Sequence, residues 1–239
     1  MSEPVLMGIV NATPDSFSDP QGEKSLEALV ERAHELTAAG AAMIDVGGES
    51  GRTDRPAVPV EEERARVVPL IERLAADGLT VSVDTWRAPV ALAALDAGAS
   101  IVNDVSGLSD PEVADACAEA DARLVITHTR AAPKVKAFPD YADVVADVIE
   151  LLRERAELGR PLLVAVSRKD FVGALTGRSP AARDAGTLAA VGVAADAGAQ
   201  ILRVHDVAAA RDYLAVRAAL ANGASRSLEL DPNLRREPV

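Results

Sequence analysis

The sequence predicts an α/β fold of repeated βα units, and it favours a closed (β/α)8 barrel over an open doubly wound sheet. Short apolar runs alternate with Ala-, Leu- and Glu-rich helical patterns that end near glycine. The runs are continuously apolar, as is typical of parallel strands covered on both faces. No G-x-G-x-x-G turn follows the first run, and polar residues follow the carboxyl ends of most runs, where barrels build their sites.

Seven of these apolar runs are predicted to be strands. They are Val5–Val10, Ala42–Val46, Thr80–Val83, Ile101–Asn103, Leu124–Thr127, Leu162–Val166 and Ile201–Val204. Helices are predicted at Ser25–Ala39, Val60–Ala76, Ala88–Ala97, Pro111–Glu119, Tyr141–Leu158, Arg183–Ala197 and Ala208–Asn222. Because no linker rich in Pro or Ser divides the chain, residues 1–222 are expected to form one domain and 223–239 a polar C-terminal tail.

Composition narrows the functional class. The 239 residues are 49% hydrophobic and 26% charged, which suits a globular domain with a substantial core. A net charge of −12 disfavours nucleic acid and anionic lipid as partners. The single cysteine, Cys117, lies in an Ala-rich helical pattern and is expected to be buried. With neither a secretory signal pattern nor a membrane-length apolar run, we expect a cytoplasmic protein.

The polar residues that follow the predicted strands have a distinctive chemistry. Amide and carboxylate groups can bind the donor and acceptor edge of a flat heterocycle, and arginine with histidine can hold a phosphate or diphosphate. By spacing alone, the set fits any barrel enzyme that uses phosphate. Its members are Asn11, Asp45, Glu49, Asp84, Asn103, Asp104, His128, Ser167, Arg168, Lys169, Arg203, His205 and Asp206.

Six short segments, taken in order, resemble the dihydropteroate synthase family. The resemblance covers the chain from residue 8 to residue 207, and it implies a TIM barrel, (β/α)8, of the dihydropteroate synthase type. The segments are Gly8–Asp19, Ile44–Ser50, Val83–Thr85, Val102–Gly107, Ser167–Lys169 and Arg203–Val207.

The resemblance also implies a reaction. Members of the family condense p-aminobenzoate with 6-hydroxymethyl-7,8-dihydropterin diphosphate in folate biosynthesis, and diphosphate is the leaving group. This chain is therefore expected to be a transferase with two small-molecule substrates, Mg²⁺ as cofactor and a homodimeric assembly. Stabilising charge on the leaving group and orienting the pterin are then the main catalytic tasks.

Roles carried over from the family fall on particular residues of this chain. Asn11 would be a Mg²⁺ ligand, and Arg52, Arg203 and His205 would contact the diphosphate. The pterin pocket would be lined by Asp84, Asn103, Lys169 and Arg203, with Lys169 also reaching toward p-aminobenzoate. Ser50, Asp15 and Phe17 would contact substrate, the last two from a loop that closes over the site and excludes water. The residues expected to be catalytic are Asp84, Lys169, Arg203 and His205.

Three of these residues also have a plain structural interpretation. Asn11 could initiate a turn, Asp84 could cap the helix that begins near Arg87, and Asn103 could be a satisfied strand-end amide. Away from this set, His34 is expected to be a solvated or helix-packing side chain and Trp86 to serve packing.

The largest departure from the family is a missing βα unit. The family's sixth strand ends in an Asp-Pro-Gly-x-Gly-Phe-like motif, whose aspartate is a principal pterin ligand. Here Asp140–Arg160 has room for a single helix, so seven strands are expected where the family has eight. Removing a unit removes hydrogen bonds from both flanking strands. We therefore expect a gapped barrel, with an exposed seam or a seam covered by dimer contacts.

Smaller departures from the family bear on substrate specificity. Gly51 and Thr53 stand where the family usually has threonine and proline. Asp170 follows Lys169 where serine is frequent, and a carboxylate there would repel the carboxylate of p-aminobenzoate.

Three functions therefore stay open at this point. The chain is a divergent synthase, a repurposed or inactive paralogue, or a non-catalytic pterin-binding protein. Asn11, Arg52 and His205 placed around one anion would favour the enzyme.

Overall fold

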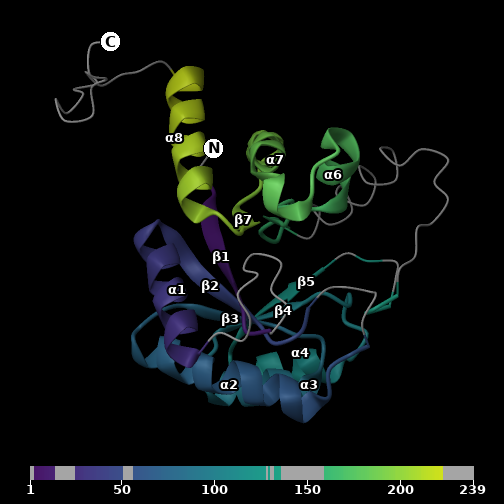
Figure 1. The fold of residues 1–239 in the computed structure, drawn as a ribbon. Coiled ribbons are helices and arrows are strands. Elements are labelled where there is room, and N and C mark those ends of the chain that lie inside the picture. The colour runs from purple at the N-terminus through teal and green to yellow at the C-terminus, as the bar shows by residue number, and fades with distance from the viewer. Residues whose placement is uncertain are drawn as a thin grey trace.

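The computed structural model describes residues 3–13, 25–50, 56–127, 129, 132–135 and 159–222. These residues contain a seven-stranded parallel sheet wrapped by helices into a nearly closed barrel (Figure 1). The barrel prediction is confirmed. The strands are β1 (Val5–Asn11), β2 (Ala41–Gly47), β3 (Val81–Asp84), β4 (Ile101–Asp104), β5 (Arg123–Ile126), β6 (Leu163–Val164) and β7 (Ile201–Val204).

The strand order is β5-β4-β3-β2-β1-β7-β6, so the last strand pairs with the first, as it does in a barrel. Within the described residues, β5 pairs with β4 alone and β6 with β7 alone. The seven-strand prediction is thus confirmed for this part of the chain, and the seam lies between β5 and β6. The helix predicted at Tyr141–Leu158 lies outside the described residues.

Helices follow the strands in the expected alternation, and two short elements were not predicted. A helix at Asp170–Thr176 (α6) and a 3-10 turn at Pro180–Ala182 (η1) follow β6. Val172 is the one buried residue of α6, so the sequence offers no apolar stripe by which to find this helix. The others are α1 (Leu26–Ala38), α2 (Val60–Ala76), α3 (Ala88–Asp96), α4 (Glu112–Glu119), α7 (Asp184–Asp196) and α8 (Val207–Asn222).

Side chains alternate between two apolar layers along each strand. On β1, Leu6 and Val10 belong to the large core between sheet and helices, whereas Met7 belongs to a small cluster with Met43 and Ile101. Fully burying such a side chain contributes about 1.5–3 kcal/mol. The small cluster fills the amino-terminal part of the barrel interior. Polar groups occupy the interior positions further along the strands.

Those polar positions come from strands far apart in the sequence. Asp45 lies two residues after Met43, and Asn103 lies two residues after Ile101, so each shares a strand face with the apolar residue before it. Arg203 is related to Ile201 in the same way. Cys117 is buried, as predicted, and none of the described helices is long and apolar enough to cross a membrane.

Candidate active site

Asp45 is the centre of a buried polar network at the carboxyl end of the barrel. Its side chain is fully buried and accepts three hydrogen bonds. One oxygen accepts from the Ser82 hydroxyl at 2.6 Å, and the other from Asn103 Nδ2 at 3.1 Å and Arg203 Nε at 2.6 Å. A carboxylate can be buried at this depth because it is paired with a guanidinium and its oxygens are hydrogen-bonded.

Arg203 joins this centre to Asp84. Its Nη2 atom lies 2.7 Å from Oδ2 of Asp84, and the Asp84 side chain keeps 20% of its surface exposed. Burial raises the pKa of Asp84 to about 7; Arg203 opposes this shift, and Asp45 adds to it. Burial by itself would lower the pKa of Arg203, but the two carboxylates raise it. The guanidinium is thus a fixed positive charge, whereas Asp84 titrates in the physiological range.

Lys169 lies at the exposed rim of the network and is electrostatically coupled to it. Loss of surrounding water and the neighbouring Arg203 lower the pKa of Lys169, while Asp84 and Asp170 oppose this shift. Four of the predicted pterin-binding residues, Asp84, Asn103, Lys169 and Arg203, are therefore brought together from four segments of the chain. The N-cap residue of α3 is Arg87, and the first helical N–H, that of Ala88, donates to Asp110 Oδ2 at 3.1 Å, so the alternative of Asp84 as the cap of this helix is wrong.

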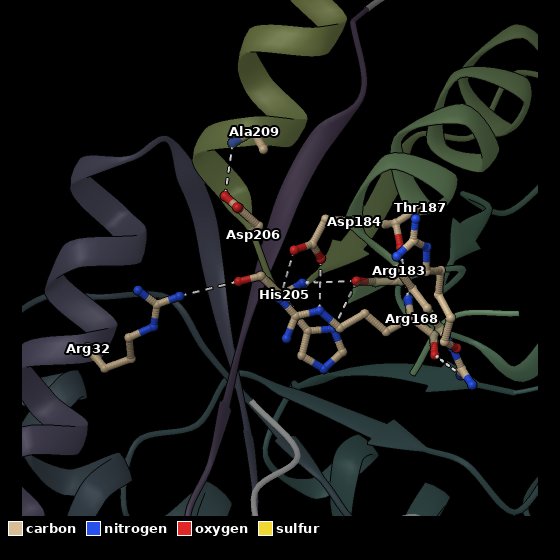
Figure 2. A network of polar contacts seen from close by, with 10 residues as sticks. Arg32, Arg168, Arg183, Asp184, Thr187, His205, Asp206 and Ala209 are labelled. Atoms are coloured by element: carbon tan, nitrogen blue, oxygen red, sulfur yellow. Dashed lines mark hydrogen bonds and ion pairs between the residues drawn. The ribbon is translucent and has the colours of Figure 1, made fainter. Parts of the chain in front are cut away.

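His205, just beyond β7, is held by contacts on several sides. Its Nδ1 lies 2.8 Å from the Ser167 hydroxyl, and its carbonyl accepts a hydrogen bond of 3.3 Å from Arg32 on α1. Asp206 caps α8 by accepting from the backbone N–H of Ala209 at 2.9 Å. Figure 2 shows His205 between Arg32 and the Arg168–Asp184 pair. Burial lowers the pKa of His205 to about 4, with Arg168 and Arg203 contributing, so the ring is neutral at pH 7.

The backbone of Arg168 adopts a left-handed conformation, with φ of 58°. This conformation costs free energy in a non-glycine residue, so it persists where surrounding contacts enforce it. Its N–H donates to Thr187 Oγ1 at 3.0 Å, and its Nε lies 3.0 Å from Asp184 Oδ1 (Figure 2). Its carbonyl accepts from Arg183 Nη1 at 2.9 Å. The start of α7 thus sets the turn that carries Ser167 and Lys169.

Arg183 also changes the interpretation of Asp170. Its Nη1 lies 3.0 Å from Asp170 Oδ1, and its Nε donates to the carbonyl of Arg178 at 3.0 Å. The Asp170 side chain is 92% exposed. The carboxylate expected to repel p-aminobenzoate is therefore paired with a guanidinium and open to solvent, which screens its charge.

A second polar cluster ties the loop after β2 to two neighbouring loops. The Glu49 side chain is 2% exposed and lies 3.0 Å from both Arg87 Nη2 and Lys134 Nζ. Arg87 also pairs with Glu63 on α2 and stacks its guanidinium 4.6 Å from the centre of the Trp86 ring. The Ser50 carbonyl accepts a 2.5 Å hydrogen bond from Lys134 Nζ. These contacts hold Ser50 near the barrel rim and give Trp86 its predicted packing role.

Asn11 is the last residue of β1 and pairs in register with Gly47. A Cβ atom at Gly47 would lie 3.3 Å from Asn11 Oδ1 and 4.0 Å from Asp84 Oδ2. The absence of a side chain at this position therefore leaves the space that these two oxygens flank. Of the other predicted site residues, Asp15, Phe17 and Arg52 lie outside the described part of the chain, as do Gly51 and the strand-end residue His128.

Sequence reasoning singled out Asp45 as a polar strand-end residue but gave it no role in the site. The structure makes it the hydrogen-bonding centre of the site. An acidic residue within the apolar run Ala42–Val46 was the available signal, because an unpaired carboxylate is rarely buried in a strand. Arg183, Asp184 and Thr187 were not singled out, since they act through the fold of α6 and α7. His34 contacts Asp77 at 2.9 Å on the surface, as expected of a solvated histidine.

A barrel whose carboxyl end gathers amide, carboxylate, lysine and guanidinium groups has the polar small-molecule site of a β/α-barrel enzyme. The model of the pterin binding enzyme family matches residues 7–160 and 152–205, and the chain belongs to this family. Within it, the relatives are dihydropteroate synthases. The Escherichia coli enzyme is 37% identical over 87% of this chain and 88% of its own length. A probable bifunctional folylpolyglutamate synthase/dihydropteroate synthase of Haloferax volcanii is 40% identical over 95% of this chain, which spans 31% of that larger protein.

Solved structures give the same result. The Xanthomonas albilineans dihydropteroate synthase with 4-aminobenzoic acid superposes with a TM-score of 0.81 at 41% identity, over 92% of this chain and 93% of that one. The same enzyme with 7,8-dihydropteroate gives a TM-score of 0.77 at 40% identity. The Escherichia coli alignment runs over 248 positions but includes 87% of this chain, about 208 residues, so about 40 positions have no counterpart here. A difference of this size is close to that of one βα unit.

Proposed function

We propose that this protein condenses p-aminobenzoate with 6-hydroxymethyl-7,8-dihydropterin diphosphate to form 7,8-dihydropteroate and diphosphate. The relatives described above are dihydropteroate synthases, and the two Xanthomonas complexes hold a substrate and a product of the reaction. The observation that carries the proposal is the Arg203 guanidinium, which is paired with Asp45 and Asp84 at the end of the barrel interior. It offers a planar heterocycle a rigid frame of donors and acceptors.

In the proposed complex, the pterin ring lies against Asp84, Asn103, Lys169 and Arg203. Ionised Asp84 would accept hydrogen bonds from ring N–H groups, and Asn103, fixed by its bond to Asp45, would present its amide oxygen. Lys169 at the rim would reach toward p-aminobenzoate. Because Asp45 and Arg203 are already locked together, orienting the ring costs little reorganisation on binding.

The reaction breaks the bond between the pterin methylene carbon and the diphosphate oxygen, and the electron pair leaves with the diphosphate. The amino nitrogen of p-aminobenzoate then bonds to the methylene and loses a proton. Arg203 and His205 would donate hydrogen bonds to the departing diphosphate, which stabilises the charge that develops there. Arg52, Ser50, Asp15 and Phe17 keep their expected roles in substrate contact.

The space above Gly47, which Asn11 Oδ1 and Asp84 Oδ2 flank, suits a Mg²⁺ ion that enters with the substrate. Mg²⁺ binds oxygen ligands and usually keeps waters and substrate phosphates in its shell, so it needs few protein ligands. The Asn11 amide oxygen, beside the space above Gly47, would hold it. Bound Mg²⁺ would neutralise negative charge on the diphosphate.

We also propose a homodimer of single-domain protomers, each a barrel spanning residues 1–222 with a tail at 223–239. Helices α6, α7 and α8 carry large apolar side chains that are exposed in the single chain: Phe171, Leu175, Val193, Val216 and Leu220. These helices lie beside one another (Figure 1), and a second copy would cover such side chains. Sedimentation equilibrium of the full chain tests this proposal, with a Val193→Glu variant expected to shift the protein toward monomer.

The reaction itself is tested by diphosphate release with purified protein, the pterin diphosphate and Mg²⁺. Release that requires p-aminobenzoate, together with dihydropteroate identified by mass, would support the proposal. Calorimetric titration of the pterin diphosphate into the folded protein separates the alternatives. Binding without turnover would indicate an inactive or regulatory pterin-binding protein, and absence of binding would indicate a paralogue with another ligand.

A further inference from the structure

Ser167 and His205 face each other across two paired strands. Strands β6 and β7 pair Leu163 with Ile201 and Val164 with Leu202, and continuing this register places Ser167 opposite His205. The Ser167 hydroxyl lies 2.8 Å from His205 Nδ1 and accepts a hydrogen bond of 3.3 Å from the backbone N–H of His205. Ser167 is only 8% exposed. One buried hydroxyl therefore contacts both the ring and the backbone of the same histidine.

The hydroxyl has a single hydrogen, and this limits how the two contacts can be satisfied. If Nδ1 carried a proton, it would donate to Ser167, and the serine hydrogen would need another acceptor. In the part of the chain that the structure describes, this hydroxyl makes no hydrogen bond besides these two. If Nδ1 is unprotonated, the serine donates to it, and both the hydroxyl and Nδ1 are satisfied, as buried polar groups generally are.

Burial and the positive charges nearby keep the His205 ring neutral, so the choice of tautomer matters. Burial lowers the pKa of His205 to about 4; Arg168, Arg203 and Lys169 favour the same direction, and Asp184 opposes it. Arg32 contributes a further positive charge near the His205 carbonyl. A neutral imidazole carries one N–H, and this is on Nε2 when Nδ1 accepts from Ser167.

We propose that Ser167 is a positioning residue that holds His205 as its Nε2–H tautomer, so that the ring offers a hydrogen-bond donor to the departing diphosphate. The identity of this ligand rests on the proposed function, whereas the tautomer itself does not. In the opposite tautomer, Nε2 would present a lone pair to an anionic oxygen and repel it. A donor placed on the leaving group strengthens as negative charge develops there.

The tautomer can be read directly by ¹⁵N NMR of protein labelled at histidine. The chain has three histidines, so His34→Gln and His128→Gln leave His205 as the only labelled ring. At pH 7 and without ligand, we expect a protonated Nε2 and an unprotonated Nδ1. In Ser167→Ala we expect Nδ1 to lose its donor and the ring to become a mixture of tautomers. A protonated Nδ1 in the parent protein, or no change in Ser167→Ala, would overturn the proposal.

The functional consequence is measured by titrating inorganic diphosphate with Mg²⁺ into each variant. We expect Ser167→Ala to raise Kd about ten-fold at pH 8, as expected for one lost hydrogen bond to a charged group. The ratio of the Kd of Ser167→Ala to that of the parent should fall as the pH is lowered toward 5. An imidazole freed from Ser167 gains a proton more readily, and the protonated ring then attracts the anion. Ser167→Thr, which keeps the hydroxyl, should restore the parent value.

Ser106→Ala is the matched control, since Ser106 is also 8% exposed and accepts one backbone hydrogen bond, from Ser109 at 2.9 Å. It should leave Kd within about two-fold of the parent. Equal effects of the two alanine variants, or a ratio that does not vary with pH, would contradict the proposal. If the parent protein binds no diphosphate, the proposed function fails, and the NMR result still decides the tautomer.

Discussion

Asp45 and Arg203, separated by 158 residues in the sequence, meet across the barrel interior with the Asp45 Oδ2 and Arg203 Nε atoms 2.6 Å apart. This pair fixes the guanidinium that also binds Asp84, and it fixes the amide of Asn103 through the other hydrogen bond to the same Asp45 oxygen. The positions of Arg203, Asn103 and, through Arg203, Asp84 thus depend on one aspartate that is fully buried. Its geometry is set by the pairing of β2 with β1 and of β1 with β7.

Asp45→Asn should weaken both stability and pterin binding. The amide keeps the size of the carboxylate but leaves a buried guanidinium with less compensating charge, which costs about 3–5 kcal/mol in comparable buried pairs. We expect a correspondingly lower free energy of unfolding in urea and at least a ten-fold rise in Kd for the pterin diphosphate. Asp212→Asn, at an exposed position paired with Arg211, is the control and should change neither. A stable Asp45→Asn protein with unchanged Kd would exclude this role for Asp45.

Asp84 should make stability fall as pH rises from about 4 to 7. Its ordinary pKa is 3.8, and burial raises it to about 7 in the folded protein. Between these values the native state holds a proton that the unfolded chain has lost, so raising the pH favours unfolding. The free energy of unfolding of the parent minus that of Asp84→Asn should therefore decrease across this range and level off above pH 8. Urea titrations at four or five pH values measure it, and a difference that increases with pH would refute the prediction.

Substitution of Arg183 should impair the site, although Arg183 acts on the site only through the turn that carries Ser167 and Lys169. Its guanidinium binds the carbonyls of Arg168 and Arg178 and the carboxylate of Asp170, and a lysine ammonium cannot reach all three. We expect Arg183→Lys to lose about 1–3 kcal/mol of stability and about ten-fold in kcat/KM, because Ser167 and Lys169 are displaced. Arg64→Lys on the exposed face of α2 serves as the control. Melting temperature and steady-state kinetics together test this.

Gly173→Ala should mimic the loss of Arg183. Alanine normally stabilises a helix by about 1 kcal/mol relative to glycine. Here the new Cβ would lie 2.2 Å from Arg183 Nη2, so the guanidinium must move. We expect Gly173→Ala to destabilise the parent but to stabilise the Arg183→Ala background, in which the space is empty. A double-mutant cycle by thermal unfolding gives the coupling, and additive effects would disprove the contact.

The edge strands β5 and β6 should be the part of the sheet that is least protected against amide hydrogen exchange. In the described residues, β5 and β6 each have one strand neighbour, whereas β1 has two. Hydrogen exchange measured by mass spectrometry should show amides of Arg123–Ile126 and Leu163–Val164 exchanging about ten-fold or more faster than those of β1. Protection equal to that of β1 would mean that another segment or a second copy pairs with these edges.

The sequence by itself determined the barrel, the seven strands of the described residues and the polar strand-end residues from which the proposed site is built. It could do so because parallel strands buried on both faces are read from local apolar runs, and because polar residues that follow such runs must gather at one end of a barrel. Asn11, Asp84, Asn103, Lys169 and Arg203 were all found in this way.

Tertiary structure alone decided how these residues are held. Asp45 became the centre of the site, Asp170 was paired with Arg183, and Ser167 was placed against His205, because each contact joins segments that are brought together by strand register or by helix packing. The short helix α6 escaped sequence analysis for the same reason, since its stability comes from packing and not from an apolar period of its own. Local pattern thus identifies the polar groups that gather at the end of the barrel, whereas long-range contacts set their orientation and charge.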